Sequence, residues 1–229
     1  DHPDFVDRQF NLDTERAVVI GNGNVALDVA RMLLMSAEQL QRTDVADHAL
    51  TALSNSRMRE VVVLGRRGPA QAAFTVPELL ELAGLDDIGV TVECRSEPSW
   101  HDDQSAHPLR LTLLRELANR QPRGRARRLV LRFLASPIEL IGGERVEGLL
   151  WSRNRLVAGV EGKLRAEPTG EVEMLPTGLV LRSVGYRATP PPAIPFDAAA
   201  DVVPNHDGRV IDLPGDTPLA GVYVAGWLK

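Results

Sequence analysis

Two glycines and two asparagines follow a short apolar run near the start of the chain, and this combination can bind phosphate groups. The segment 21–25 reads GNGNV, between the apolar run at 17–20 and a periodic apolar stretch that begins at about Asn24. Gly21 allows a tight turn, Gly23 lets the backbone approach phosphates closely, and Ala26 allows close packing of helix on strand. This strand–turn–helix pattern predicts a dinucleotide site with the pyrophosphate at the helix N-terminus.

An arginine pair follows the second β-type run, Val61–Leu64 and its glycine. NAD sites usually place a carboxylate here for the ribose 2′-hydroxyl, whereas NADP sites place arginine for the 2′-phosphate. Arg66 and Arg67 therefore favour NADP, because guanidinium groups bind phosphate with paired hydrogen bonds. The spacing from Gly21 exceeds the usual ~20 residues, which we attribute to an insertion through about Arg57. A solvated charged pair at a strand end is the alternative.

Two carboxylates share one face of the helix predicted over Phe74–Ala83, with Thr75 as its candidate N-cap. Glu78 and Glu81 are three residues apart, so they lie one helical turn from each other. Such a pair can contact a ligand at the helix start. Ordinary solvated carboxylates on an amphipathic helix are the alternative.

The composition is that of a globular protein, with 229 residues, 44% hydrophobic and 25% charged, which suits one or two domains. A net charge of −5 gives no indication of nucleic-acid or membrane binding. No apolar run is long enough to span a bilayer, and no signal peptide is visible. The single cysteine, Cys94, cannot form an internal disulfide. We expect no metal site and a cytoplasmic location.

The remaining pattern predicts a three-layer α/β Rossmann-type domain with a parallel sheet, flanking helices and an antiparallel β-meander crossover. The helices expected after the first motif cover Gln39–Asn55, starting near Thr43–Asp44, and His107–Asn119. A strand is expected over Val90–Cys94 and a basic loop over 121–128. The runs expected to form the meander are Leu129–Leu134, Val146–Ser152 and Leu179–Val184. A proline-rich connector and a last strand over Val222–Ala225 follow.

Five segments together resemble the NADPH-binding domain of adrenodoxin-reductase-type ferredoxin–NADP⁺ reductases, over essentially the whole chain. They are GNGNVALDVAR, GRRGPAQAAFTVPELLEL, RFLASPIEL, RSVGYR and VYVAGWLK. The resemblance implies a fragment of a longer flavoprotein that lacks most of its FAD site. It implies a linker from the FAD domain (1–16), the NADPH-binding domain (17–186) and a return connector that starts the C-terminal FAD segment (187–229).

The resemblance also implies roles for single residues. The residues implied to bind the cofactors are Gly21, Asn22, Gly23, Asn24 and Val25 at the pyrophosphate, Arg66 and Arg67 at the 2′-phosphate, Glu78 at the nucleotide, and Trp227 with its backbone beside the flavin. Glu81 is implied to lie near the nicotinamide and the flavin, as the catalytic candidate. The implied reaction passes a hydride from NADPH to FAD and electrons to a ferredoxin-like iron–sulfur protein; the fragment alone is expected to be inactive.

An acidic ferredoxin would dock on basic side chains. The candidate arginines are Arg110, Arg115, Arg120, Arg123, Arg125, Arg127 and Arg128. A solvated basic face is the alternative for this cluster. For the chain as a whole, a non-catalytic NADP-binding module and the flavoprotein subunit of a glutamate-synthase-like enzyme stay open.

Overall fold

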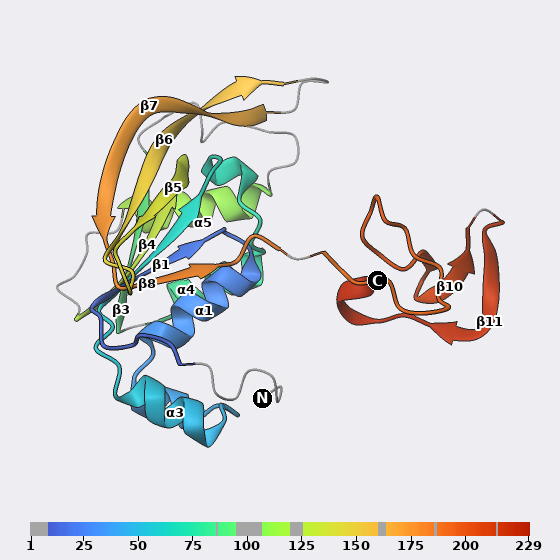
Figure 1. Cartoon of the computed structure of the whole chain (residues 1–229), viewed down its shortest axis with the longest axis horizontal. Helices are drawn as coiled ribbons and strands as arrows, with labels where there is room; N and C mark the ends of the chain where they lie inside the picture. Colours follow the sequence, from blue (N-terminus) through green and yellow to red (C-terminus); the bar gives the residue numbers. More distant parts are fainter. Residues whose placement is uncertain are drawn as a thin grey trace. The chain divides into compact units, whose positions relative to one another are not determined.

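The computed structural model of this chain describes residues 9–85, 87–94, 107–119, 126–159, 164–185, 187–213 and 215–229. Its contacts divide the chain into two compact units, Asp1–Val184 and Gly185–Lys229. Figure 1 traces the elements of both units. The first unit contains the glycine motif and the arginine pair, and the second contains the proline-rich segment and the C-terminal strands.

A five-stranded parallel sheet lies in the middle of the first unit, with the strand order β3-β4-β2-β1-β8. The strands are β1 (Arg16–Ile20), β2 (Glu60–Gly65), β3 (Ile88–Glu93), β4 (Arg127–Phe133) and β8 (Leu179–Arg182). All six residues of β2 are buried, because a central parallel strand is covered on both faces. The predicted α/β class with a parallel sheet is thereby confirmed.

Helices bury one face of this sheet. They are α1 (Asn24–Leu34), α4 (Val76–Ala83) and α5 (Pro108–Asn119). Their apolar side chains form one core with alternate residues of the central strands, among them Val19, Val63 and Leu131. The buried residues of α1 recur at helical spacing, and the amphipathic helix predicted from about Asn24 therefore forms here.

An antiparallel sheet buries the other face. Its strands, in the order β5-β6-β7, are β5 (Ala135–Ile141), β6 (Gly148–Ala158) and β7 (Leu164–Pro176). The strand residues between those of the helical core, such as Val18, Val62 and Val130, pack against this sheet around the buried Trp151. The three layers are therefore helices, parallel sheet and antiparallel meander (Figure 1), with α1, α4 and α5 on one face only.

The boundaries of the meander differ from the prediction. Leu129–Leu134 and Leu179–Val184 were expected within it, but β4 and β8 pair in parallel with β2 and β1. The prediction was wrong because a buried apolar run reads alike in parallel and antiparallel strands. The change of sheet takes place at Leu134, whose φ of 56° connects β4 directly to β5.

Two short helices, α2 (Ala37–Leu40) and α3 (Asp47–Ser54), replace the single helix predicted over Gln39–Asn55. The Thr43–Asp44 pair lies in the turn between them. The helix start is Ser36 instead: its Oγ accepts from the Gln39 amide at 3.2 Å, and Gln39 Oε1 accepts from the Ser36 amide at 2.8 Å. This capping box was the better signal. Both helices precede β2, so an insertion accounts for the long spacing to the arginine pair.

The second unit contains a small antiparallel sheet in the order β11-β10-β9. Its elements are β9 (Asn205–His206), β10 (Arg209–Asp212), β11 (Thr217–Tyr223) and a closing 3₁₀ turn, η5 (Gly226–Leu228). The last strand thus ends at Tyr223 and does not cover Val222–Ala225 as expected. Among the described residues of both units, no helix is long and apolar enough to cross a membrane.

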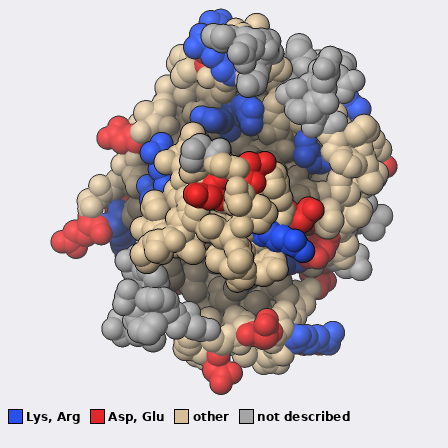
Figure 2. Space-filling model, turned by 90° about the vertical axis from the view of Figure 1, so that its right-hand side faces the viewer, with Lys and Arg blue, Asp and Glu red and all other residues tan. Residues whose placement is uncertain are grey.

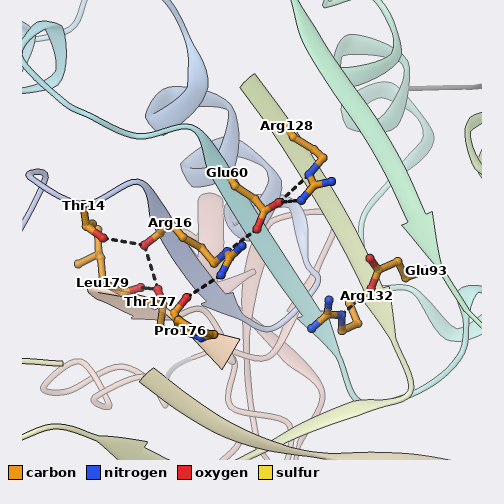
Figure 3. A network of polar contacts seen from close by, with 9 residues as sticks. All are labelled: Thr14, Arg16, Glu60, Glu93, Arg128, Arg132, Pro176, Thr177 and Leu179. Carbon is orange, nitrogen blue, oxygen red and sulfur yellow. Dashed lines mark hydrogen bonds and ion pairs between the residues drawn. The ribbon is translucent and has the colours of Figure 1, made fainter. Parts of the chain in front are cut away.

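A buried carboxylate joins three strands at the amino edge of the parallel sheet (Figure 3). Glu60 of β2 forms ion pairs with Arg16 of β1 and Arg128 of β4. Arg16 also donates to the Pro176 carbonyl at 2.9 Å, and its own carbonyl accepts from the Thr177 hydroxyl at 2.9 Å. These contacts line a cavity of about 870 Å³. The network therefore fixes the amino ends of β1, β2 and β4 and the segment that leads into β8.

The pKa of Glu60 reflects this surrounding. Burial alone would raise it, but hydrogen bonds from Arg128 and Arg16 and their positive charges outweigh burial, so the pKa lies below its usual value. A depressed pKa in the folded state means that the ionised carboxylate stabilises the fold above the pKa of an unfolded glutamate, about 4.3. That stabilisation is lost as the pH falls through the folded-state pKa.

The substitution Glu60→Gln should lower the free energy of unfolding at pH 7 by about 2 kcal/mol, because it leaves two partly buried guanidinium groups without their carboxylate. The difference from the wild type should shrink toward acidic pH. Urea unfolding across the pH range measures both effects. Glu38→Gln is the control, since its ion pair with Arg42 has side chains 76% and 75% exposed and should contribute little. A difference that persists undiminished in acid would contradict this account.

Candidate nucleotide-binding site

The glycine motif and the arginine pair lie at the same edge of the parallel sheet. Ile20, the last residue of β1, pairs with Leu64 of β2 and with Arg182 of β8. The carboxyl ends of parallel strands meet at one edge, so the segments 21–23, 66–67 and 183–184 are neighbours there. In open α/β sheets, this carboxyl edge is where ligands bind.

Gly21 is required by the fold itself. Its φ is +110°, and an added Cβ would lie 2.0 Å from the carbonyl oxygen of Ser183. Its amide donates to the Leu64 carbonyl at 3.0 Å. Any side chain here would be strained and would collide with the segment after β8. Gly21 thus determines where β1 ends.

Gly23 is not required by the fold. Its φ of −88° is open to any residue, and, apart from its own chain neighbours, no atom of the described residues lies within 4 Å of an added Cβ. It occupies the N-cap position of α1 without any side-chain cap, and no described residue accepts from the amides of Asn24 and Val25. Unpartnered helix amides beside open space form an anion-binding arrangement.

Asn24 connects two helix starts. Its Nδ2 donates to Glu78 Oε1 at 3.0 Å, and its Oδ1 accepts from the Thr75 amide at 2.8 Å. Both ends of the amide side chain therefore have a partner within the protein, and these contacts orient the side chain between the two helix starts. Thr75 does occupy the N-cap position of α4 as predicted, but its side chain forms no capping hydrogen bond.

Glu78 keeps one carboxylate oxygen without a partner. Oε1 is bound by Asn24, whereas Oε2 is buried and has no hydrogen-bond partner among the described residues. Leaving such an acceptor unpaired is unfavourable in a folded protein. Its place in the first turn of α4 partly offsets this, because the helix dipole stabilises negative charge there. The second oxygen is therefore an acceptor that the described part of the chain leaves unpaired.

Glu81 lies one turn further along α4 and has a structural partner. It forms an ion pair with Arg31 of α1, and Arg31 also contacts Asp28 at 3.0 Å. The side chain of Glu81 is 58% exposed. In this arrangement Glu81 joins α1 to α4, and its catalytic role stays a prediction.

The arginine pair follows β2 directly, and its backbone is held by the meander. The Arg66 carbonyl accepts from Asn154 Nδ2 at 2.8 Å, and the Arg67 carbonyl accepts from the Leu134 amide at 3.1 Å. Arg66 is exposed and Arg67 half-buried. Neither guanidinium forms an ion pair with another residue in the described part of the chain. Asn154 was missed from sequence because no local signal connects it to a turn 88 residues away.

Comparison with known proteins identifies relatives of this arrangement, although no family model matches the chain. The chain is 47% identical over 233 residues to the NADPH-ferredoxin reductase FprA of Mycobacterium tuberculosis, covering 100% of this chain and 50% of that protein. The mitochondrial NADPH:adrenodoxin oxidoreductase of Bos taurus is 39% identical over 235 residues, with 96% and 46% covered. The solved structure of M. tuberculosis FprA in complex with NADPH has a TM-score of 0.82 at 46% identity, with 100% and 50% covered.

This chain is homologous to part of these reductases. It spans about half the length of the curated relatives it matches. The resemblance inferred from the motifs is confirmed, and the structural match supports the Rossmann-type fold class. The role of each residue at the glycine motif stays a prediction.

Several arginines predicted to dock a ferredoxin have internal partners in this reductase homologue. Arg110 donates to the carbonyls of Ala70 at 3.0 Å and Phe74 at 3.3 Å, and burial lowers its pKa from the usual value. Arg127 donates to the Leu34 carbonyl at 2.8 Å at the end of α1. Arg128 is bound to Glu60. The sequence could not separate these anchors from solvated arginines.

The remaining predicted docking arginines are Arg115, Arg120, Arg123 and Arg125. Arg115 of α5 is exposed, while Arg120, Arg123 and Arg125 lie outside the described residues. In the view of Figure 2, basic and acidic side chains are interspersed with uncharged ones over the coloured surface. Trp227 lies in η5, and its side chain is outside the described part.

The two glycines of the motif should respond differently to alanine. Gly21→Ala should lower the free energy of unfolding by about 2–4 kcal/mol, because it adds strain at positive φ and a collision with Ser183. Gly23→Ala should cost no more than about 1 kcal/mol, the value for losing a good N-cap residue. Thermal and urea unfolding of both variants measure the contrast. Equal losses would mean that Gly23 is also structural.

Proposed function

We propose that this chain is the NADPH-binding part of a flavin-dependent ferredoxin–NADP⁺ reductase. The observation that carries the proposal is the meeting, at one sheet edge, of unpartnered α1 amides over open space at Gly23 and an arginine pair without ion-pair partners among the described residues. The homology to FprA, whose solved structure contains NADPH, supports it. Neither alternative function has a specific observation in its favour.

The pyrophosphate would bind at the start of α1. The segment Asn22–Val25 offers backbone amides there, and the positive end of the helix dipole favours the negative charge. An added Cβ at Gly23 would project into the space that the phosphates need. Glu78 would then accept a hydrogen bond from a nucleotide hydroxyl with its unpartnered Oε2.

Arg66 and Arg67 would bind the 2′-phosphate that distinguishes NADPH from NADH. Two planar, permanently charged groups suit a dianionic phosphate. Other described arginines, such as Arg16, Arg31 and Arg153, are engaged in ion pairs within the chain. The pair after β2 keeps its charge available for a ligand.

Glu81 is proposed to lie near the nicotinamide, and the backbone of Trp227 beside the flavin. What supports Glu81 is its position one turn after Glu78 on the same face of α4. Support for Trp227 comes from the resemblance of the GWLK segment alone. When bound, NADPH and FAD supply the redox chemistry, a hydride from the nicotinamide to the flavin and then single electrons to the iron–sulfur partner. This chain's residues bind and orient the nucleotide.

The double variant Arg66→Ala/Arg67→Ala tests the nucleotide preference. Calorimetric titration should give a much tighter Kd for NADP⁺ than for NAD⁺ in the wild type, by about 100-fold, because two charged hydrogen-bonding groups are involved. The double variant should lose that preference and leave the NAD⁺ affinity nearly unchanged.

Arg42→Ala is the matched control for this experiment, since Arg42 is an exposed arginine paired only with Glu38. It should retain the NADP⁺ preference. If the wild type binds neither nucleotide, the same titration on a longer form of the protein decides whether a further domain is needed. Failure there as well would refute the proposed function.

The electron acceptor is proposed to be a ferredoxin-like iron–sulfur protein that docks on a surface that includes the exposed Arg115 of α5. Acidic partners associate faster with basic surfaces, and the relatives are named as ferredoxin and adrenodoxin reductases. Cys94, the single cysteine of the chain, fits the proposed cytoplasmic location, because it forms no disulfide within the chain.

Charge reversal at two positions of α5 separates docking from folding. Arg115→Glu should weaken ferredoxin reduction by the complete reductase severalfold at low salt and spare a small artificial acceptor. Arg110→Glu should instead destabilise the fold, because its guanidinium bonds the Ala70 and Phe74 carbonyls. Steady-state assays with both acceptors, together with thermal unfolding, measure this. Equal losses with both acceptors in Arg115→Glu would refute docking there.

A further inference from the structure

A closed chain of hydrogen bonds holds the backbone of the arginine pair. The Leu134 amide donates to the Arg67 carbonyl at 3.1 Å, and the Asn154 amide donates to the Leu134 carbonyl at 2.8 Å. Asn154 Nδ2 then donates to the Arg66 carbonyl at 2.8 Å. Both carbonyls of the pair are thus bound by residues at the start of the meander and in β6.

Asn154 is held firmly in place for this contact. It is 6% exposed, and the same Nδ2 also lies 2.7 Å from Ser136 Oγ. Its backbone amide is fixed by Leu134. A buried amide with this many partners keeps one orientation, and so does the carbonyl that it binds.

Two features of this chain of bonds oppose folding. Asn154 Oδ1 is buried without a partner among the described residues. Leu134 is buried and is not a glycine, yet its φ is 56°. A buried unpaired acceptor and a residue in the left-handed region each cost free energy. Both lie next to the Arg66–Arg67 turn. Strain concentrated in this way is typical of functional sites.

We propose that Asn154 is a positioning residue that sets the preference for 2′-phosphorylated nucleotides by fixing the backbone from which Arg66 and Arg67 extend. The inference rests on the proposed function. Arginine side chains are long and have many rotamers, so a loose backbone would spread the guanidinium groups over many positions and weaken a paired contact with phosphate. With the backbone fixed, the side chains of Arg66 and Arg67 extend from defined positions and directions.

The effect should be limited to ligands that carry the 2′-phosphate. Asn154 donates hydrogen bonds to Leu134, Arg66 and Ser136, and none of these partners lies in the segment 21–25. Binding of the pyrophosphate at α1 is common to NADP⁺ and NAD⁺. Removal of the Asn154 hydrogen bonds should therefore weaken the binding of NADP⁺ and spare that of NAD⁺. A general loss of structure would instead weaken the binding of both nucleotides.

The decisive variant is Asn154→Leu, which keeps the branched shape of the side chain and removes both hydrogen bonds that Nδ2 donates. Asn154→Ala is the second variant, in case the larger side chain disturbs the core. Ser136→Ala is the matched control, since it removes the other partner of the same amide and leaves the Arg66 contact. The probes are NADP⁺, NAD⁺ and 2′,5′-ADP, titrated calorimetrically, with thermal unfolding of each variant alongside.

The expected result is that Asn154→Leu and Asn154→Ala weaken NADP⁺ and 2′,5′-ADP by about tenfold, the scale of one hydrogen bond in a positioned contact, and leave NAD⁺ within about twofold. Ser136→Ala should bind all three probes like the wild type. Equal weakening of NADP⁺ and NAD⁺, or no change in either, would overturn the role of Asn154. If the wild type itself does not prefer NADP⁺, the proposed function fails, which is a different outcome.

Discussion

The central strands β1, β2 and β4 must be apolar on both faces, because helices bury one face of the parallel sheet and the antiparallel meander buries the other. Successive residues of a strand point to opposite faces, so Val18 and Val19 enter different cores. A shift of one residue would exchange these sets, and each set is shaped to its own layer. The register of the sheet is thereby specified, and with it the position of every residue at the strand ends.

Charged residues of these strands are confined to the strand ends. The two edges of the sheet differ in how far their polar groups are paired within the protein. At the amino edge, Arg16 and Arg128 both pair with Glu60 (Figure 3). These three residues line the cavity of about 870 Å³ at that edge, which is the edge of the sheet opposite to the glycine motif. At the carboxyl edge the polar groups stay unsatisfied. The first two backbone amides of α1, those of Asn24 and Val25, have no acceptor among the described residues. Glu78 Oε2 has no donor there either.

The parts of the site that the sequence predicts are those whose signals are local. The strand, the glycine turn and the helix that starts at Asn24 occupy one continuous stretch, and the arginine pair directly follows a buried strand. Contacts between residues far apart in the sequence could not be predicted from these local signals. The use of the Asn24 side chain between Thr75 and Glu78 and the support of Arg66 by Asn154 depend on residues that only the tertiary fold brings together. The meander was expected, but its limits were not, because the chain passes from the parallel sheet to the antiparallel sheet at a single residue, Leu134.

The meander does more than cover an apolar face. Trp151 packs into the core below the parallel sheet, and the guanidinium groups of Arg132 and Arg153 lie over its ring, with 4.8 Å and 5.2 Å to the centroid. Arg132 belongs to β4 and Arg153 to β6, so this contact joins the two sheets beside Asn154. A helix in place of the meander could bury the same apolar surface, but its backbone groups would be bonded within the helix. The chain leaves the parallel sheet at Leu134, and β6 brings Asn154 back beside Leu134. A backbone amide and a side-chain amide thereby reach the carbonyls of the arginine pair.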